Sequence, residues 1–264
     1  TDSLEVRRFH PSFTINHLTG TQKNTYEYVD NNATDSLYGD FFQAADSSFY
    51  RLYYHQIPNR VFFNYSGLKA NRDSAQYYNL KVEFGAQHDN IELWQNRKEF
   101  TTNNFHIYTA LRSNPLALKK WSYAINTHYY LTGYNHNDWQ FSANFGYNLD
   151  KFGVATISGK IEQQEAAWIE QNYASSSLNW TYNFDKKTHS LIAFDYQLTK
   201  QQFNFHAAYH RIGNFVYFDE NSRPKQLQNT TSYWQINASK NLNFKILHFD
   251  NFIGIQGNNN QEAL

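Results

Sequence analysis

The stretch WSYAINTHYYLTGYNHNDWQFSANFGYNL (residues 121–149) alternates between apolar and polar side chains on both sides of a short polar break. The odd positions read Trp, Tyr, Ile, Thr, Tyr, Leu before the break and Trp, Phe, Ala, Phe, Tyr, Leu after it. Because successive side chains of a strand point to opposite faces, the pattern predicts a hairpin with one apolar and one polar face. The segment GYNHND (133–138) is its predicted exposed turn. The apolar face must lie either in a soluble core or against lipid.

The same alternation recurs along the whole chain and predicts on the order of a dozen strands, most of them close to the 9–11 residues of a membrane strand. It is clearest in five segments: YNLKVEFGA (78–86), FHIYTALR (105–112), SLNWTYNF (177–184), SLIAFDYQL (190–198) and FNFHAAYHR (203–211). Further predicted strands are residues 12–18, 59–68, 91–95, 153–161, 212–218, 231–240, 242–249 and 251–257. Residues 161–170 fit either a short helix or a flared strand end. The four prolines are expected at the edges of these segments.

Composition excludes several classes of protein. The 264 residues carry a formal net charge of zero, which argues against a dedicated nucleic-acid binder. The chain has no cysteine, so disulfides, zinc–thiolate sites and thiol catalysis are excluded. Without any methionine, Thr1 is not a translation start, and we expect a processed chain or an excerpt. The mean hydropathy of −0.76 still allows a barrel, because only alternate strand residues would face lipid.

Two features favour a membrane barrel over a soluble sandwich, and a third fits both. In the clearest strands the charged residues Lys81, Glu83, Arg112 and Asp195 all fall on the polar face, which a soluble sandwich would also show. Tryptophans and tyrosines lie near predicted strand ends, where membrane interfaces select amphipathic rings. Short turns such as NLDKFG and LTKQQ contrast with long polar connections such as IEQQEAAWIEQNYASS, which is typical of barrels.

Residues 173–226 resemble a family of outer-membrane porins of Bacteroidetes. The resembling features are the aromatic-rich strand after Ser177, the run from Asn214 to Asp219 that leads to Pro224, and the segments NRVFFNYSGLKANRDSAQYYNLKVEFGAQHDN and FDNFIGIQGNNN (249–260). The resemblance implies an outer-membrane β-barrel. A bacterial barrel usually ends in a strand with a terminal aromatic residue, whereas this chain ends GNNNQEAL. The resembled family's members are also longer than this chain. We therefore expect an excerpt that lacks strands at one or both ends.

Searches for catalytic and metal-binding patterns favour no site. His206 and His210 are four residues apart, which is about 13 Å along a strand and too far for one metal ion. The pair Asp219–Glu220 lies in a polar loop, where solvated charge is expected rather than a glycosidase site. No nucleophile elbow, zinc-protease, P-loop or dinucleotide motif is present. The sequence predicts no enzyme activity, no metal and no cofactor.

The sequence therefore predicts an all-β, antiparallel up-and-down transmembrane β-barrel of about a dozen or more strands in this chain, as a single domain over residues 1–264 that forms part of a larger barrel. The predicted function is passive diffusion of small polar solutes across a bacterial outer membrane. The expected partners are outer-membrane lipid, small polar solutes and other outer-membrane proteins, with no nucleic acid. Two alternatives stay open: a soluble β-sandwich that binds carbohydrate through its aromatic rings, and a non-conducting structural barrel within a larger outer-membrane complex.

The alternation also assigns side chains to the two faces. A slip of one residue would invert the assignment in any strand. The residues predicted to line the lumen are Lys81, Glu83, His106, Arg112, Asn126, His128, Asn144, Asn183, Asp195, Asn204, His206 and His210. The residues predicted to face lipid or form an aromatic girdle are Trp121, Tyr123, Trp139, Phe141, Phe145, Trp180, Phe194 and Phe205.

Overall fold

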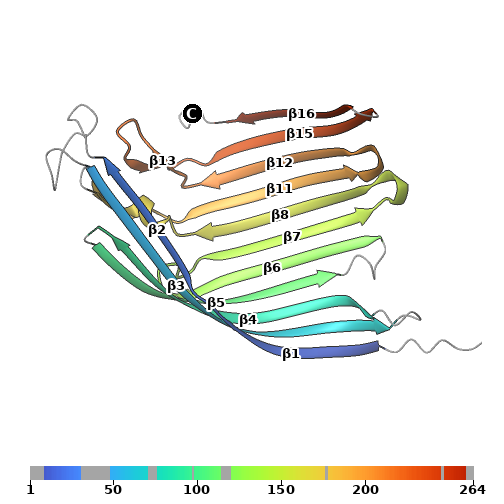
Figure 1. Ribbon diagram of the computed structural model, residues 1–264, viewed down its shortest axis with the longest axis horizontal. Helices are drawn as coiled ribbons and strands as arrows, with labels where there is room; N and C mark the ends of the chain where they lie inside the picture. The colour runs from blue at the N-terminus through green and yellow to red at the C-terminus, as the bar shows by residue number, and fades with distance from the viewer. Residues whose placement is uncertain are drawn as a thin grey trace, which may run out of the picture.

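The computed structural model describes residues 9–30, 48–70, 76–96, 98–113, 120–175, 178–244 and 247–259. Within these residues one antiparallel sheet of 12 strands dominates the molecule (Figure 1). Its strands are β1 (Phe9–Thr19), β2 (Gln22–Asp30), β3 (Ser48–Ala70), β4 (Gln76–Gln95), β5 (Lys98–Ser113), β6 (Trp121–Thr132), β7 (Trp139–Asn148), β8 (Val154–Gln164), β11 (Lys187–Leu198), β12 (Phe203–Gly213), β15 (Thr231–Phe244) and β16 (Leu247–Asn258). The predicted all-β antiparallel architecture is confirmed.

The sheet is a meander in which most strands pair with the next strand along the chain. Two of the described connections carry short elements of their own before the chain returns to the sheet. Between β8 and β11 lie α2 (Trp168–Gln171) and the hairpin of β9 (Asn172–Ala174) and β10 (Asn179–Thr181). Between β12 and β15 lies the hairpin of β13 (Val216–Phe218) and β14 (Pro224–Gln226). Among the residues described, no helix is both long and apolar enough to cross a membrane.

The strands β1 and β2 both pair along the same side of β3, so β3 has one long composite partner. The partner is interrupted at Gly20 and Thr21, opposite Pro58, and the Gly20 N–H donates to the Pro58 carbonyl at 3.3 Å. Proline has no N–H to donate to a neighbouring strand. At Pro58 this donor is not needed, because the partner strand is interrupted opposite it. The expectation that every proline lies at a segment edge is wrong for Pro58, which lies well inside β3.

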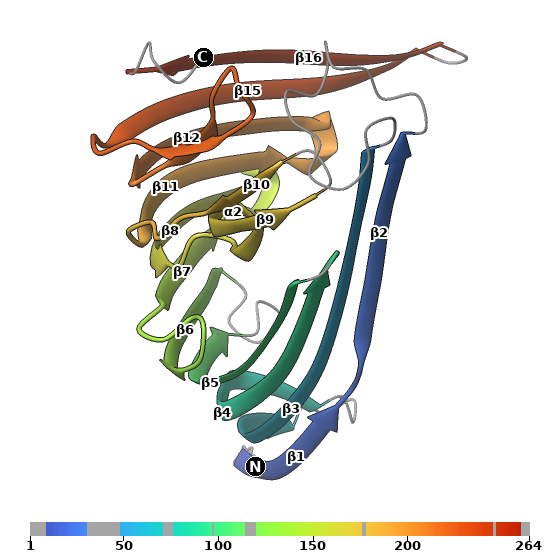
Figure 2. The ribbon, with the colours of Figure 1, turned by 90° about the vertical axis from the view of Figure 1, so that its left-hand side faces the viewer.

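The sheet is curved and open, with β1 and β2 at one edge and β16 at the other (Figure 2). On its concave side lie α2, β9 and β10. The ring of Trp168 in α2 stacks on Phe100 of β5 with centroids 3.7 Å apart, which identifies the face of β5 that carries Phe100 as concave. We call the two sides the concave face and the convex face. Strand register then assigns every paired residue to one of them.

The two ends of the sheet differ in how the strands are connected. At the end that we call the turn end, β7 joins β8 through the 3-10 turn Asp150–Phe152, and β11 joins β12 through Thr199–Gln201. At the opposite end, the loop end, residues 133–138, 165–186 and 214–230 make longer connections. The sequence suggested short turns on both sides of residues 190–198. In the structure only the turn after Leu198 is short, because the connection before Lys187 spans residues 165–186. The contrast between the two ends holds from β6 to β12, whereas β4 and β5 are joined at the loop end by a short link between Gln95 and Lys98.

Several predicted strand boundaries are wrong, because alternation does not reveal where a segment leaves the sheet. Residues 91–95 continue β4. The predicted strand 177–184 is reduced to the three residues of β10, outside the main sheet, and that of 212–218 is divided between β12 and β13. Residues 242–249 contain the end of β15 and the start of β16. The predicted strands also omit β2 entirely. Of the helix considered for residues 161–170, only α2 forms.

Gly153 closes the β7–β8 turn with φ = 96°, and an added Cβ would overlap the carbonyl oxygen of Gln197. We predict that Gly153→Ala lowers the free energy of unfolding by more than about 1 kcal/mol, because alanine disfavours this φ and cannot fit. The matched control is Gly159→Ala in β8, where the nearest atom to an added Cβ is 4.0 Å away. Denaturant unfolding followed by tryptophan fluorescence would measure both variants, and equal losses would contradict the prediction.

Candidate functional site

The concave face gathers nearly all the side chains predicted to line a lumen. Register places eleven of the twelve on it: Lys81, Glu83, His106, Arg112, Asn126, His128, Asn144, Asp195, Asn204, His206 and His210. Asn183 does not join them, because it follows β10 in the connection that leads to β11. The shared face is a structural fact, whereas its role as a lumen stays a prediction.

The concave side of β3, β4 and β5 carries a cluster centred on Arg60. The Arg60 guanidinium donates to Glu83 Oε1 at 2.7 Å and to the Tyr108 hydroxyl at 2.5 Å, and it lies 4.5 Å from the centre of the Tyr108 ring. Lys81 lies 3.7 Å from the other oxygen of Glu83. Gly85 pairs with Tyr108, and a Cβ there would run into the ring. The glycine therefore lets Tyr108 lie down over β4 toward Arg60.

A second cluster lies next to it, toward the loop end. The amides of Gln56 and Gln87 both donate to Asp89 Oδ1, at 2.9 and 2.8 Å. His106 places Nδ1 3.8 Å from Asp89 Oδ2, and its ring lies 5.9 Å from that of His128. Asp89 and His106 are both buried. A buried carboxylate needs such donors to offset its lost hydration, so this cluster presents a fixed polar surface rather than a free charge.

A third group spans β8, β11 and β12. Lys160 lies 2.7 Å from Glu162, and His206 lies 2.7 Å from Asp195. His210 lies four residues from His206, about 13 Å along β12, and hydrogen-bonds to His189 on the adjacent β11. Among the described residues, no group of three or more histidines and carboxylates is arranged to hold a metal ion.

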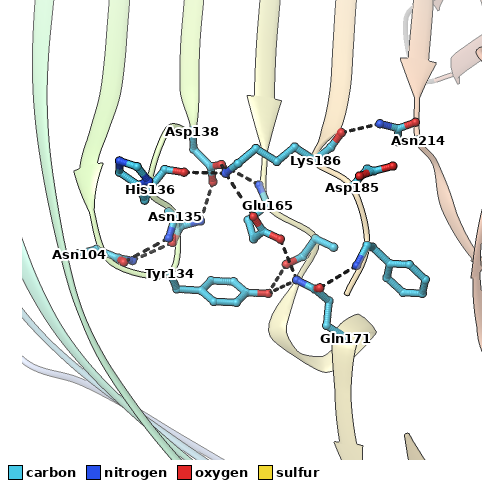
Figure 3. A network of polar contacts seen from close by, with 12 residues as sticks. Asn104, Tyr134, Asn135, His136, Asp138, Glu165, Gln171, Asp185, Lys186 and Asn214 are labelled. Atoms are coloured by element: carbon cyan, nitrogen blue, oxygen red, sulfur yellow. Dashed lines mark hydrogen bonds and ion pairs between the residues drawn. The ribbon is translucent and has the colours of Figure 1, made fainter. Parts of the chain in front are cut away.

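The connection between β8 and β11, residues 165–186, forms what we call the strap, of which all but 176–177 is described. Lys186 anchors its end: its ammonium contacts Asp138 Oδ1 at 2.5 Å and Glu165 Oε2 at 3.2 Å, and donates to the His136 carbonyl at 2.7 Å (Figure 3). Asp138 also accepts from the Glu165 N–H at 2.9 Å. The predicted exposed turn 133–138 is therefore wrong at Asp138, which is buried by these contacts.

Gln171 fixes the middle of the strap. Its amide donates to the Tyr134 hydroxyl at 2.8 Å and to Glu165 at 2.9 Å, while its Oε1 accepts from the Phe184 N–H at 3.0 Å (Figure 3). Tyr134 in turn donates to the Ala166 carbonyl at 2.5 Å. Burial raises the pKa of Tyr134 to about 12, against an opposing effect of the Gln171 hydrogen bond. The phenol therefore remains a donor throughout the neutral range.

An aromatic stack joins the strap to the long strand β3. Tyr50 of β3 stacks on Tyr173 of β9 at 4.8 Å, and Tyr173 stacks on Trp180 of β10 at 4.3 Å. Phe218 of β13 lies edge-on to Trp180 at 6.2 Å. Since the strap leaves the sheet between β8 and β11 yet touches β3, it crosses the concave side of the curved sheet (Figure 2).

The residues predicted to face lipid divide in a similar way. Seven of them share the convex face by register: Trp121, Tyr123, Trp139, Phe141, Phe145, Phe194 and Phe205. Trp180 is the exception, because it lies in the hairpin of the strap and is buried between Tyr173 and Phe218. The residues next to Trp180 in the sequence alternate as in a barrel strand, but they pair with β9 rather than with the main sheet.

Sequence reasoning missed the partners that complete the concave clusters. The missed partners are Arg60, Tyr108, Asp89 and Glu162. Alternation could have identified Arg60 and Tyr108, because it assigns them to the face opposite that of their apolar neighbours in the sequence. No sequence signal points to the contact of Lys186 with Asp138, which joins residues 48 positions apart.

Lys186 provides a test of how firmly the strap is held. Burial lowers its pKa, but the hydrogen bonds and charges of Asp138 and Glu165 outweigh that effect and leave the pKa raised. The ammonium thus stays charged below its ordinary pKa, and the contact is lost only as pH rises through the raised value. We predict that Lys186→Gln weakens the strap by about 1–3 kcal/mol, because the buried Asp138 carboxylate loses its cation.

Amide hydrogen exchange would measure this at Tyr182 and Phe184, whose N–H groups bond to Gln171. Exchange should accelerate severalfold or more at both amides. Lys225→Gln is the matched control, since the Lys225 side chain is 60% exposed and its ion pair with Asp219, at 3.1 Å, lies outside the strap. Unchanged exchange in Lys186→Gln would show that the strap does not depend on this cation.

Comparison with known proteins agrees with this architecture. A family model described as "Putative porin" matches residues 3–264, which is nearly the whole chain. No curated protein matches the chain. The chain therefore belongs to this porin family.

Proposed function

We propose that the protein is an outer-membrane porin whose convex face lies against lipid and whose concave face lines a polar path for small solutes. The observation that carries the proposal is the opposite character of the two faces. The convex face exposes large apolar side chains with no layer over them in the described part of the chain: Phe63, Phe84, Phe141, Phe145, Ile157, Ile192, Phe194, Ile236, Ile253 and Ile255. A soluble protein would have to cover such a surface.

The convex face also contains an uncharged band of the right height. On β12 and β15 its charged residues are Arg211, toward the loop end, and Lys240, which pairs with Phe203 toward the turn end. Eight residues separate these two rows along β12, which is about 26 Å at the rise of a strand. The apolar band of an outer-membrane barrel is about 25 Å tall. The band between Arg211 and Lys240 therefore fits the hydrocarbon layer.

The concave face supplies fixed charges of both signs. Arg60 and Lys81 lie beside Glu83, and Lys160 lies beside Glu162. Rings of charged side chains bias which ions enter a pore. Because each of these charges is paired with a neighbour, the wall favours polar solutes of either sign over strong selection of one. The open sheet forms a pore only when its edges β1 and β16 are joined, and we propose that further strands of a longer chain complete the barrel.

A second candidate function, a non-conducting structural barrel, is favoured by the strap. It crosses the concave side and is held by Lys186, Gln171 and the stack of Tyr50 on Tyr173. Planar-bilayer recording of the full-length protein distinguishes the two functions. Stepwise conductance is expected of a porin, and an insertion that never conducts would favour the structural barrel.

The concave charges make a prediction for the same recordings. Glu83→Gln should shift the reversal potential in the direction that indicates a greater preference for anions. The reason is that Arg60 and Lys81 are then left without their carboxylate. Glu99→Gln on the convex side of β5 is the matched control and should leave selectivity unchanged. A reversal potential that is the same in both variants and in the wild type would place Glu83 outside the conducting path.

The convex face makes an independent prediction. Ile157 is exposed on the convex face of β8, and its neighbour Ser158 lies on the concave face. We predict that Ile157→Lys lowers the free energy of unfolding in lipid vesicles by roughly 2–4 kcal/mol, since the ammonium lies within the hydrocarbon layer. Ser158→Lys should cost much less. Denaturant titration in vesicles would measure both, and equal costs would contradict the assignment of the faces.

A further inference from the structure

We propose that Glu162, His189 and His210 form a hydrogen-bonded chain that makes the charge selectivity of the concave face depend on pH. These three residues, which we call the histidine chain, lie on β8, β11 and β12. The proposal rests on the porin function proposed above. It adds a specific group of residues that determines which ions the path prefers.

The distances define a continuous chain. His189 Nδ1 lies 3.0 Å from Glu162 Oε1, and His189 Nε2 lies 3.1 Å from His210 Nδ1. Both contacts join adjacent strands, because β11 lies between β8 and β12. The His210 ring stacks on Tyr233 of β15 with centroids 4.2 Å apart and a tilt of 7°. Four neighbouring strands thus hold the chain in position.

The two imidazole rings meet end to end rather than face to face. Their planes differ by only 4°, and their centroids are 5.4 Å apart. The distance between the ring centres exceeds the 3.1 Å between the two nitrogens by roughly the width of one ring, which is one ring radius on each side. Both nitrogens therefore lie on the line that joins the ring centres. This is the geometry of a linear N–H···N hydrogen bond. A metal ion shared by both rings would instead need lone pairs that converge on a point off that line.

The proton positions follow from this geometry. With both histidines neutral, His189 donates from Nδ1 to Glu162, and its Nε2 accepts from His210 Nδ1–H. One added proton can enter at His210 Nε2 and leave every hydrogen bond of the chain in place. A second proton would put N–H groups on both facing nitrogens, so the bond between the histidines would break. The chain therefore takes up its two protons in unequal steps.

The charges around the chain decide what each proton does to the path. Lys160 lies 2.7 Å from Glu162, so these two cancel. On the same face, Lys187 pairs with Glu170 at 2.9 Å and His206 with Asp195 at 2.7 Å, while Tyr233 is neutral. No unpaired carboxylate of these neighbours remains to offset a proton on His210. A proton that enters at His210 Nε2 therefore adds a net positive charge to this part of the wall as the medium turns acidic.

Planar-bilayer recordings of the full-length protein test the selectivity. Between pH 7.5 and pH 5.0 the ratio of chloride to potassium permeability should rise severalfold in the wild type. The rise should be largely lost in the double variant His189→Gln/His210→Gln. His206→Gln removes a histidine of the same face outside the chain, and should retain most of the rise. A rise that survives the double variant, or that is lost in His206→Gln alone, would overturn the proposal.

A titration of the histidine resonances by NMR in detergent tests the chain without conductance. The ring signals of His189 and His210 should move together in two separated steps, and Glu162→Gln should change both. Two independent single steps, unaffected by Glu162→Gln, would overturn the proposal. If the protein shows no conductance, the porin function fails, and the coupled titration still decides whether the chain exists.

Discussion

Antiparallel backbone pairing with a side-chain period of two is the constraint on which the rest of the structure depends. Once two neighbouring strands are in register, residues opposite each other share a face across the whole sheet. One such row crosses eight strands on the concave side: Glu83, Ala110, Asn126, Ser142, Lys160, Leu191, His210 and Tyr233. A slip of one residue in β8 would move Lys160 and Glu162 to the convex face. Which side chains lie on the concave face is therefore determined by the register of the strands.

The same constraint explains why the polar clusters occur between strands rather than along them. Side chains on one face are close only when they lie on adjacent strands, opposite or diagonal to each other. Arg60, Glu83 and Tyr108 come from three consecutive strands, and so do Glu162, His189 and His210. Each cluster is held by backbone ladders on both sides. Such side chains have little freedom to reorient, and fixed groups bind or repel ions at lower entropic cost than mobile ones.

Alternation in the sequence was sufficient to predict the two faces but not the limits of the strands. Ile157 and Ser158 could be assigned to opposite faces from their spacing alone. Residues 177–184 alternate just as clearly, yet Trp180 lies in a small hairpin outside the main sheet. Its pairing partner is β9, and the alternation of its own segment does not reveal that partner. Contacts such as that of Lys186 with Asp138 join distant loops. Local spacing contains no information about them, since they depend on how the whole sheet curves.

The strap has a consequence for how this architecture tolerates change. Although 22 residues lie between β8 and β11, the two strands are immediate neighbours in the sheet. The strap is thus an insertion whose length does not enter the register of any strand. The entropy of closing such a loop grows only slowly with its length. Segments of different size and composition fit at this position without a shift of any strand, so the strap can change while the sheet keeps its register.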